Sequence, residues 1–541
     1  MDLNELVGNV PGGIYLLISP ILVLCLITFI LIRLKSFQTH YLILGGLVAC
    51  LIWGYKFYEL RQDYPPTPDP KRILVFPFNN FEQDKNWLPF AFWEKIIRDL
   101  NRKTDRNWIV YNSDSIFESF DSRFFASQDY RKKFAELVDA DIVVYGILVP
   151  DSSEYLGEIS FKIVEGTEKD FEPFLLNKNN FTKLTDEFAE KIISEAKIEN
   201  ENPKFEDEIE KFYSLPLPLE SYYQAKILFK ENKIDYAKTL TNELLQTFPN
   251  FPPALILLGE INLQITYRDV RKDLRGMDVY YKEGRTILRK LFEKVPNSLD
   301  YWFFKTQFHT TYKEWTTVEE YLKLLFEKTL SDARFYRILY NLAPFRWENF
   351  EKIRVHNYPE ILEKLVFLDP ASISYRILFT DFYLEKNLLD DYQTNIKKSQ
   401  KIIEEASQLR SNNVPILMRL GKVYLHKNEL EKALENYHNV VSLDSTISDA
   451  YYNLGIATFQ KRRFKESEKF LLKAIQMTKH LDSYFYLAAL YNETEDKENA
   501  LKAINKRILL SPGPSDLYIE NARLYKDLIL SKSTKPTELP Y

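Results

Sequence analysis

The chain has 541 residues, which is too long for a single compact core and predicts several domains or one extended array. Hydrophobic residues make up 45% and charged residues 28%, and these ordinary globular values exclude a chain that is disordered throughout. The formal net charge is -5 with the basic residues spread along the chain, which argues against a protein that coats nucleic acid. The two cysteines, Cys25 and Cys50, leave the rest of the chain without a disulfide framework or a cysteine-based metal site.

The first sixty residues predict a membrane anchor. No charged residue occurs from Ile14 to Ile32, and a stretch of 19 residues nearly spans a hydrocarbon core of ~30 Å. A second apolar run from Tyr41 to Tyr55 is extended by interfacial aromatic residues. The alternatives are a cleaved signal peptide, which the acidic start of the chain disfavours, and a buried core helix. We therefore expect a transmembrane helical hairpin within residues 1–62, with helices at about 14–34 and 38–58.

The distribution of basic residues predicts how this hairpin is oriented. Arg33 and Lys35 lie in the short loop, whereas the N-terminal tail has neither Lys nor Arg. This asymmetry places the loop in the cytoplasm and both ends of the chain outside. Basic residues also follow the second helix and favour the opposite orientation, so a cytoplasmic C-terminal part remains the alternative.

A proline-rich linker and a small α/β domain are predicted next. Four prolines between Tyr64 and Pro70 indicate a semi-rigid spacer over residues 63–70. The following residues, 71–199, alternate between apolar strands and amphipathic helices, which is typical of an α/β domain. The expected strands are 72–78, 108–111, 142–149 and 155–164, and the clearest helices are 89–102 and 181–196.

Two strand motifs of this domain carry a family resemblance. The opening strand reads ILVFPFNN, and a later strand lies in ADIVVYGIL. The stretch of about 70–198 resembles the TolB amino-terminal-domain-like modules of bacterial envelope proteins, which are often fused to tetratricopeptide repeats. The resemblance implies a role in protein contact and not in catalysis. No glycine-rich loop follows a strand, so we expect no nucleotide site.

The C-terminal half predicts an all-α superhelix, or solenoid, of repeats. Gly421 and Gly455 are 34 residues apart, and the small residue Ala488 follows 33 residues later. Small residues at this period let two helices of a repeat approach closely, while large apolar residues form a core with the next repeat. The pattern resembles the tetratricopeptide repeat (TPR). We expect TPR-like helices over 205–530, clearest over 414–514, followed by a disordered tail over 531–541.

Motifs that would support catalysis are missing from the sequence. The six histidines form neither HExxH nor a close pair suited to zinc, and no GxSxG, P-loop or kinase signature occurs. The carboxylate pairs lie in charged helical stretches that are typical of solvated faces. We therefore expect no enzyme, no cofactor and no metal site. An insertion from Ile265 to Gly284 carries charges of both signs and is either a surface helix or a partner-specific loop.

The concave groove of the repeats is the candidate binding site. The resemblance implies that fixed positions on the first helix of each repeat point into this groove, and these positions are Met418, Lys422, Tyr452, Ile456, Phe459 and Phe485. The set is mainly apolar and aromatic, so it does not fit the cationic clamp with which related repeats bind carboxylate tails. A peptide or helix docked through hydrophobic anchors fits better. The alternative is that these side chains pack among themselves within the superhelix.

These observations lead to one expected function and one alternative. We expect a bacterial inner-membrane scaffold or adaptor that binds other envelope proteins through the TPR superhelix and the α/β domain, in assembly of an envelope complex. Its soluble domains are expected in the periplasm, with the cytoplasm as the alternative. The alternative function is a sensor whose α/β domain binds a ligand or protein cue. The expected partners are proteins and the membrane, not nucleic acid, and the oligomeric state stays open.

Overall fold

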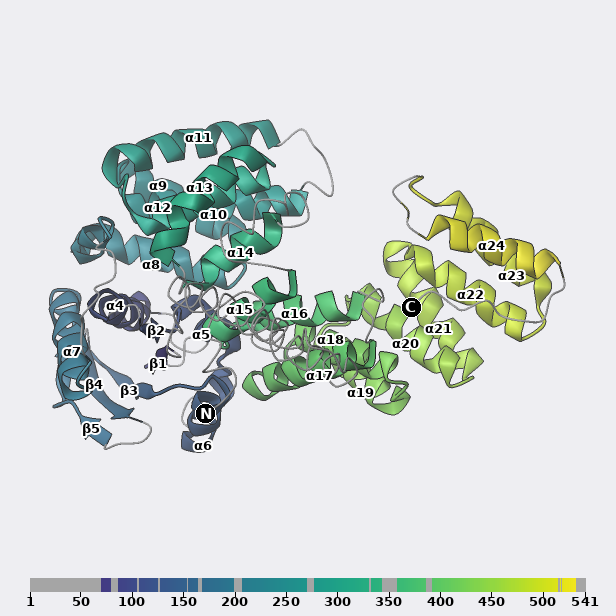
Figure 1. Ribbon diagram of the computed structural model, residues 1–541, viewed down its shortest axis with the longest axis horizontal. Coiled ribbons are helices and arrows are strands. Elements are labelled where there is room, and N and C mark those ends of the chain that lie inside the picture. The colour runs from purple at the N-terminus through teal and green to yellow at the C-terminus, as the bar shows by residue number, and fades with distance from the viewer. Residues whose placement is uncertain are drawn as a thin grey trace, which may run out of the picture. The chain divides into compact units, whose positions relative to one another are not determined.

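The computed structural model describes most of residues 70–531 (Figure 1). The gaps within this range are 79–85, 105–106, 125–126, 153, 164–167, 199–206, 270–276, 330–331, 343–357, 386–391, 514–515 and 517. The predicted transmembrane helices at 14–34 and 38–58, the linker up to residue 69 and the tail from residue 532 lie outside the described residues. None of the helices that the structure describes is long and apolar enough to cross a membrane.

The chain divides into two compact units. The first, here called the sheet unit, combines residues up to 112 with residues 139–368; the second, the C-terminal unit, combines residues 113–138 with the residues from 369 onward. This division differs from the expected one into an α/β domain over 71–199 and a repeat array over 205–530. The early helices of the array belong with the sheet, and two helices of the expected α/β domain belong with the later repeats.

A six-stranded mixed sheet forms one layer of the sheet unit. Its strands are β1 (Lys71–Val75), β2 (Trp108–Val110), β3 (Ile142–Asp151), β4 (Glu154–Ile163), β5 (Glu168–Asp170) and β6 (Phe174–Leu176). The order is β2-β1-β3-β4-β5, and β6 also pairs with β4. The strand β1 lies between β2 and β3 and is parallel to both, whereas β3 and β4 form a long antiparallel hairpin from Ile142↔Ile163 to Asp151↔Glu154. The four strands predicted from the sequence are thus present.

The helices α4 (Trp87–Lys103) and α7 (Phe181–Glu195) pack against each other beside this sheet (Figure 1). The contact is aromatic: the ring of Phe188 on α7 lies 5.9 Å from that of Phe92 on α4 and 4.9 Å from that of Phe174 on β6. The indole of Trp93 donates a hydrogen bond of 2.9 Å to the carbonyl of Val75 and so ties α4 to β1. Burial of these large rings is the main favourable term for this layer.

The remaining helices of the sheet unit follow one another as antiparallel pairs. They are α8 (Pro216–Lys230), α9 (Ile234–Thr247), α10 (Pro252–Asp269), α11 (Met277–Lys294), α12 (Leu299–Thr311), α13 (Trp315–Thr329), α14 (Ala333–Leu342) and α15 (Tyr358–Leu368). A side chain at Gly259 would collide with the ring of Phe304, so this glycine permits close packing of α10 on α12. The expected insertion from Ile265 to Gly284 falls on the end of α10, the start of α11 and the gap between them.

Contacts between α4 and α8 explain why the sheet and the first repeats form one unit. The ammonium of Lys226 on α8 donates to both carboxylate oxygens of Glu94 on α4 at 2.7 Å, and Glu94 is buried. The rings of Phe90 and Tyr223 meet edge to face at 6.1 Å. Separating these helices would expose a buried ion pair and an aromatic contact, so no domain boundary lies between them.

The C-terminal unit begins with two short helices, α5 (Ser113–Ser119) and α6 (Gln128–Leu137), that are held to helices far along the chain. The hydroxyl of Tyr130 donates to the carbonyl of Leu409 at 2.5 Å, and Arg410 donates to the carbonyl of Glu118 at 2.9 Å. The other helices are α16 (Ile373–Glu385), α17 (Tyr392–Leu409), α18 (Val414–His426), α19 (Leu430–Leu443), α20 (Ser448–Gln460), α21 (Phe464–Thr478), α22 (Leu481–Glu493), α23 (Lys497–Leu509) and α24 (Ile519–Leu530).

The helices α18 to α23 form three regular helical pairs, as the period of small residues predicted. A side chain at Gly421 would collide with the ring of Tyr437, and one at Gly455 would collide with Leu471. Each glycine therefore lets the second helix of its pair pack closely against the first.

The turn inside each pair contains a residue in the left-handed conformation, which was not predicted from the sequence. Asn428, Arg462 and Glu495 have left-handed φ angles of 59°, 58° and 61°. In each case the next N–H donates, at 2.8–2.9 Å, to a carbonyl of the preceding helix, which closes that helix with a Schellman motif. Glycine is the usual residue at this position, so the two long side chains carry a conformational penalty.

Replacing Glu495 by glycine should therefore stabilise the C-terminal unit. We expect Glu495→Gly to raise the free energy of unfolding by up to about 1 kcal/mol, because the strain removed exceeds the flexibility gained by the unfolded chain. The measurement is denaturant unfolding followed by circular dichroism. The matched control is Lys473→Gly at an exposed position inside α21, which should lose about 1 kcal/mol. Equal losses in both variants would contradict this account of the turn.

Candidate functional site

The six predicted groove residues lie on the first helices of three successive repeats. Met418 and Lys422 are on α18, and Phe485 is on α22. Between them, α20 carries the other three, Tyr452, Ile456 and Phe459. The structure thus places the set on neighbouring helices of one unit, as the resemblance implied, but it does not give all six the same surroundings.

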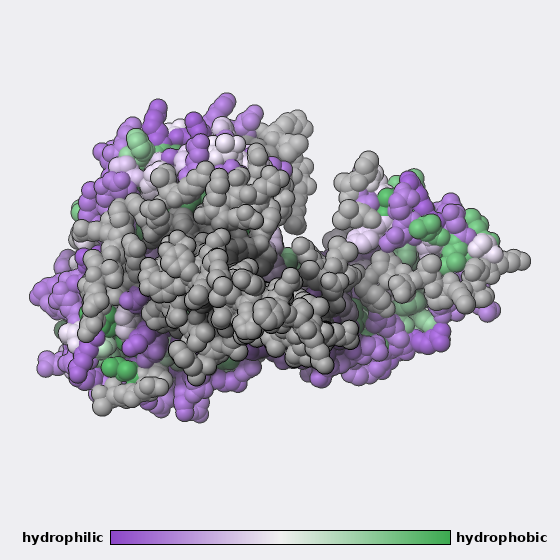
Figure 2. Space-filling view, in the orientation of Figure 1, coloured by the Kyte–Doolittle hydropathy of each residue, from purple (hydrophilic) through white to green (hydrophobic). Residues whose placement is uncertain are grey.

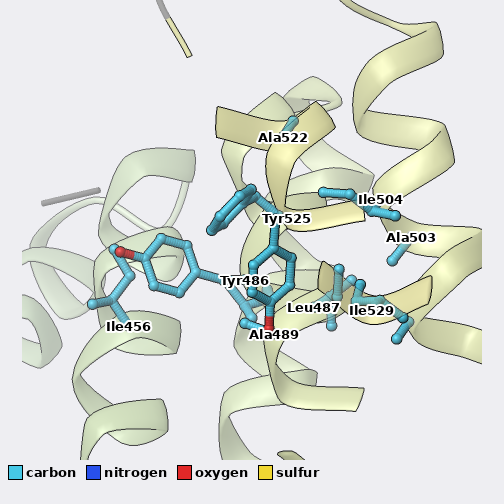
Figure 3. Close-up of a cluster of buried hydrophobic side chains, with 13 residues drawn as sticks. Ile456, Tyr486, Leu487, Ala489, Ala503, Ile504, Ala522, Tyr525 and Ile529 are labelled. Carbon is cyan, nitrogen blue, oxygen red and sulfur yellow. The ribbon is translucent and has the colours of Figure 1, made fainter. Parts of the chain in front are cut away.

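Two of the six belong to the hydrophobic core. Ile456 is 5% exposed and Phe485 is 6% exposed, and both lie in the cluster drawn in Figure 3. The ring of Phe485 lies 5.1 Å from that of Tyr525 on α24, and Ile529 of α24 belongs to the same cluster. The helix α24 thus covers Phe485, and Ile456 is buried in the same cluster, although both positions were expected to face an open groove. For Ile456 and Phe485 the self-packed alternative is therefore the correct one.

The other four candidates are half-buried, and the aromatic ones form a row of rings. The ring of Tyr452 stacks on that of His480 at 4.2 Å and meets Tyr486 at 5.8 Å. Phe459 meets the same Tyr486 at 6.1 Å. We call Phe459, Tyr486, Tyr452 and His480 the aromatic row. Tyr486 is its buried centre, and the partly exposed edges of the row offer apolar contact to a partner.

The rings of this surface are uncharged, but a carboxylate lies beside them: Nε2 of His480 is 3.6 Å from an oxygen of Asp449. Burial lowers the pKa of the His480 imidazole and raises the pKa of the Tyr452 hydroxyl well above its ordinary value, so both rings are uncharged at neutral pH. On α18, burial and then the nearby charge of Lys422 lower the pKa of His426 to about 4. Lys422 has no ion-pair partner among the described residues. A single lysine beside uncharged rings suits a mainly apolar segment better than a carboxylate tail.

The sequence analysis did not identify two members of the aromatic row. His480 precedes α22 and follows a residue in the left-handed conformation, so its place depends on the end of α21. Tyr486 is not among the groove positions predicted from the sequence. Tyr486 directly follows Phe485 in the sequence. The sequence alone therefore could not show that Tyr486 is the centre of the aromatic row and that Phe485 packs on α24.

The other main cluster of titratable groups is a partly buried network of ions in the sheet unit. Arg98 of α4 donates to Glu210 at 2.6 Å and to Asp300 of α12 at 3.1 Å, and its guanidinium lies 3.9 Å from the ring centre of Tyr213. Arg334 of α14 donates to the same Asp300 at 2.8 Å. Although burial opposes ionisation, the two arginines hold the pKa of Asp300 well below its ordinary value. Within the described residues, no group of three or more His, Cys, Asp or Glu could hold a metal ion.

Asp207 lies at the edge of this network, where its ionised form is unfavourable. The N–H groups of Leu299 and Ile209 donate to its carboxylate at 2.9 Å and 3.1 Å. Burial, and next the charge of Asp300, raise the pKa of Asp207 to about 6. The folded protein therefore favours the protonated form of Asp207 more than the unfolded chain does.

The comparisons with known proteins concern the repeats. Residues 421–461 match the family described as TPR repeat, and residues 448–480 match the family described as Tetratricopeptide repeat. The chain thus contains TPR repeats in the region that the sequence predicted, and these matches cover the helices that carry Tyr452 and Phe459. Proteins with such repeats mediate protein–protein interaction.

Similar proteins share only part of their length with this chain. The BBSome complex member BBS4 homolog of Drosophila melanogaster is 22% identical over 161 residues, which are 30% of this chain and 32% of that protein. Lipopolysaccharide assembly protein B of Escherichia coli (strain K12) is 22% identical over 154 residues, which are 28% of this chain and 39% of that protein. The solved APC/C hetero-tetramer Cut9-Hcn1 has 15% identity and a TM-score of 0.41, and the match covers 66% of this chain and 61% of that one.

Truncation of the two phenylalanines should separate core from surface. Phe485→Ala should lower the free energy of unfolding by ~3–5 kcal/mol, because it removes a buried ring and leaves a cavity. Phe459→Ala should cost only ~1–2 kcal/mol, since its ring is half exposed already. Thermal unfolding of the two purified variants is the measurement. If Phe459→Ala proves at least as destabilising as Phe485→Ala, the assignment of the two rings is wrong.

The raised pKa of Asp207 predicts how a variant responds to pH. The folded pKa lies above the unfolded value of about 3.9, so the folded protein gains stability as pH falls through about 6. We expect Asp207→Asn to be more stable than the natural protein at about pH 7.5, and this advantage to shrink toward about pH 4.5. Buried histidines with lowered pKa values make the folded protein less stable as pH falls, which opposes the effect of Asp207. Because this contribution is the same in a variant and in the natural protein, it cancels when the two are compared. The exposed Asp235→Asn is the control and should give a difference that does not change with pH. The same flat profile for Asp207→Asn would refute the prediction.

Proposed function

We propose that this chain is a membrane-anchored scaffold or adaptor that binds other proteins of the bacterial envelope during assembly of an envelope complex. The observation that carries the proposal is the set of TPR repeats matched over residues 421–480, together with the aromatic row, whose edges are partly exposed. A peptide or helix with apolar anchors would dock on that row, with Lys422 and Met418 on the neighbouring helix α18 extending the contact.

The envelope part of the proposal rests on two supports. The repeats are similar to part of Lipopolysaccharide assembly protein B, and the sheet region resembles the TolB amino-terminal-domain-like modules. The chain spans about a third of the length of the curated relatives that it matches, so their activities are not transferred as a whole. The adaptor role of the sheet follows from the resemblance and is part of the proposal.

The membrane part rests on the two apolar runs in the sequence. The stretches at 14–34 and 38–58 are long enough for a helical hairpin, and the loop between them carries Arg33 and Lys35. We therefore propose the inner membrane as the location, with the soluble units in the periplasm and the cytoplasm as the alternative.

The test is co-purification of partners from membranes with groove variants of the full chain. The tagged chain should sediment with the membrane fraction, and detergent extracts should retain a defined set of proteins. Tyr452→Ala combined with Phe459→Ala should remove that set, since interface anchors typically contribute ~2 kcal/mol or more each, about 30-fold in affinity. Circular dichroism establishes that the double variant is folded.

Two further variants keep this test decisive. Lys422→Glu changes a half-exposed residue of the same surface without truncating a ring, so it should weaken binding even if the double variant unfolds. Lys465→Glu on the exposed face of α21 is the control with the same change in charge and should bind normally. Unchanged partners in all folded groove variants would place binding elsewhere. A chain that retains no protein at all would overturn the proposed function itself.

A further inference from the structure

A stripe of basic residues runs along one exposed face of α11 in the sheet unit. Lys282, Arg285 and Arg289 are spaced three and four residues apart, so they lie on the same side of the helix. All three are exposed, and none has an ion-pair partner among the described residues. The surface over α11, at the upper left of Figure 2, is mainly hydrophilic, with a few apolar side chains among the charged ones. Many other cations of the described chain do pair with carboxylates, which sets this stripe apart.

A fourth cation on the neighbouring helix adds aromatic surface to the stripe. The ammonium of Lys305 on α12 lies 4.2 Å from the ring centre of Tyr321 and 4.5 Å from that of Trp302. Lys305 also has no ion-pair partner among the described residues. Burial, and next the like charge of Arg285, lower the pKa of the Lys305 ammonium, which shows that the two cations act on each other. Trp302 and Tyr321 are themselves only half-buried, so their rings border the basic surface.

Two carboxylates lie beside this surface: the exposed Glu320 acts on Tyr321, and Glu314 is already engaged. Glu314 accepts a hydrogen bond of 2.8 Å from the hydroxyl of Tyr281 and pairs with the imidazole of His309. Arg285 contributes to lowering the pKa of Glu314, but the two groups form no ion pair. The like charges of Arg285 and Lys305 repel each other, and neither forms an ion pair among the described residues, so an external carboxylate would relieve that repulsion.

We propose that this surface, made of Lys282, Arg285 and Arg289 on α11 with Lys305, Trp302 and Tyr321 beside them, binds an acidic segment of a partner protein. Carboxylates of the segment meet the basic stripe, and an apolar or aromatic side chain of the segment lies on the rings of Trp302 and Tyr321. Charge complementarity selects the occupant, because this face presents cations that form no ion pair within the described part of the chain, although the chain as a whole is acidic. This inference rests on the proposed function and names a second surface for it, separate from the aromatic row.

The probe for the test is a fluorescein-labelled peptide of repeated Glu-Glu-Phe triplets, and the protein is the full chain in detergent. Fluorescence anisotropy should show binding at about 50 mM salt that weakens markedly at about 300 mM salt. Arg285→Glu combined with Arg289→Glu should reduce the affinity roughly tenfold or more, since two attractive pairs become repulsive. Both residues are exposed on a helix surface, so the fold should persist.

Matched variants and probes decide whether the surface is specific. Lys465→Glu combined with Lys469→Glu makes the same change in net charge on an exposed face of α21 and should leave the affinity unchanged. Lys305→Met keeps the contact with the rings but removes the charge, and it should weaken binding to a smaller extent. A peptide of Gln-Gln-Phe triplets should bind poorly. Equal weakening in both charge-reversal variants, or equal affinity for the two peptides, would overturn the proposal.

Two other outcomes would overturn this proposal without touching the proposed function. Tighter binding of a single-stranded RNA or of anionic phosphatidylglycerol vesicles than of the acidic peptide, lost in the same variants, would replace the occupant by another anion. An unaltered set of co-purifying proteins in the Arg285→Glu, Arg289→Glu variant, together with an absence of peptide binding to the natural chain, would eliminate this surface while the scaffold role stands.

Discussion

The guanidinium of Arg98 fixes the arrangement on which the sheet unit depends. It is largely buried among Glu210, Asp300 and the ring of Tyr213; Glu210 and Tyr213 lie on one short helix, whereas Asp300 comes from α12. A buried cation is tolerable only when its countercharges and hydrogen bonds stay in place, and removal of one partner typically costs ~3–5 kcal/mol. Because Arg98 lies on α4, and α4 also packs on the sheet, the early repeat helices cannot separate from the sheet without uncovering that charge.

The two units are each held together by different kinds of contact. In the sheet unit, long-range ion pairs and aromatic contacts join helices to a sheet, and the exposed face of α11 carries cations that form no ion pair among the residues described. In the C-terminal unit, small residues and Schellman turns repeat with a fixed period, and the first helices expose an aromatic row instead. A scaffold with one basic surface and one aromatic surface can select partners of different chemistry.

The sequence predicted those parts of the fold that depend on neighbours in the chain. The strands at Ile73 and Ile142 follow from short apolar runs, and the helical pairs follow from Gly421 and Gly455. The division into units could not be predicted, because it depends on contacts such as Arg98 with Asp300, which are 202 residues apart. The burial of Phe485 was missed for a similar reason: it depends on α24, whose sequence shows the repeat pattern only weakly.

Site-specific photo-crosslinking in intact cells tests the scaffold role most directly. A photoreactive phenylalanine analogue at position 459 or 422 should form crosslinks to other proteins, because those side chains are half exposed on the proposed binding face. The same analogue at position 465, on the exposed face of α21, should give few or none. Crosslinks of equal number and identity at all three positions, or no crosslinked protein at 459 and 422, would contradict the account.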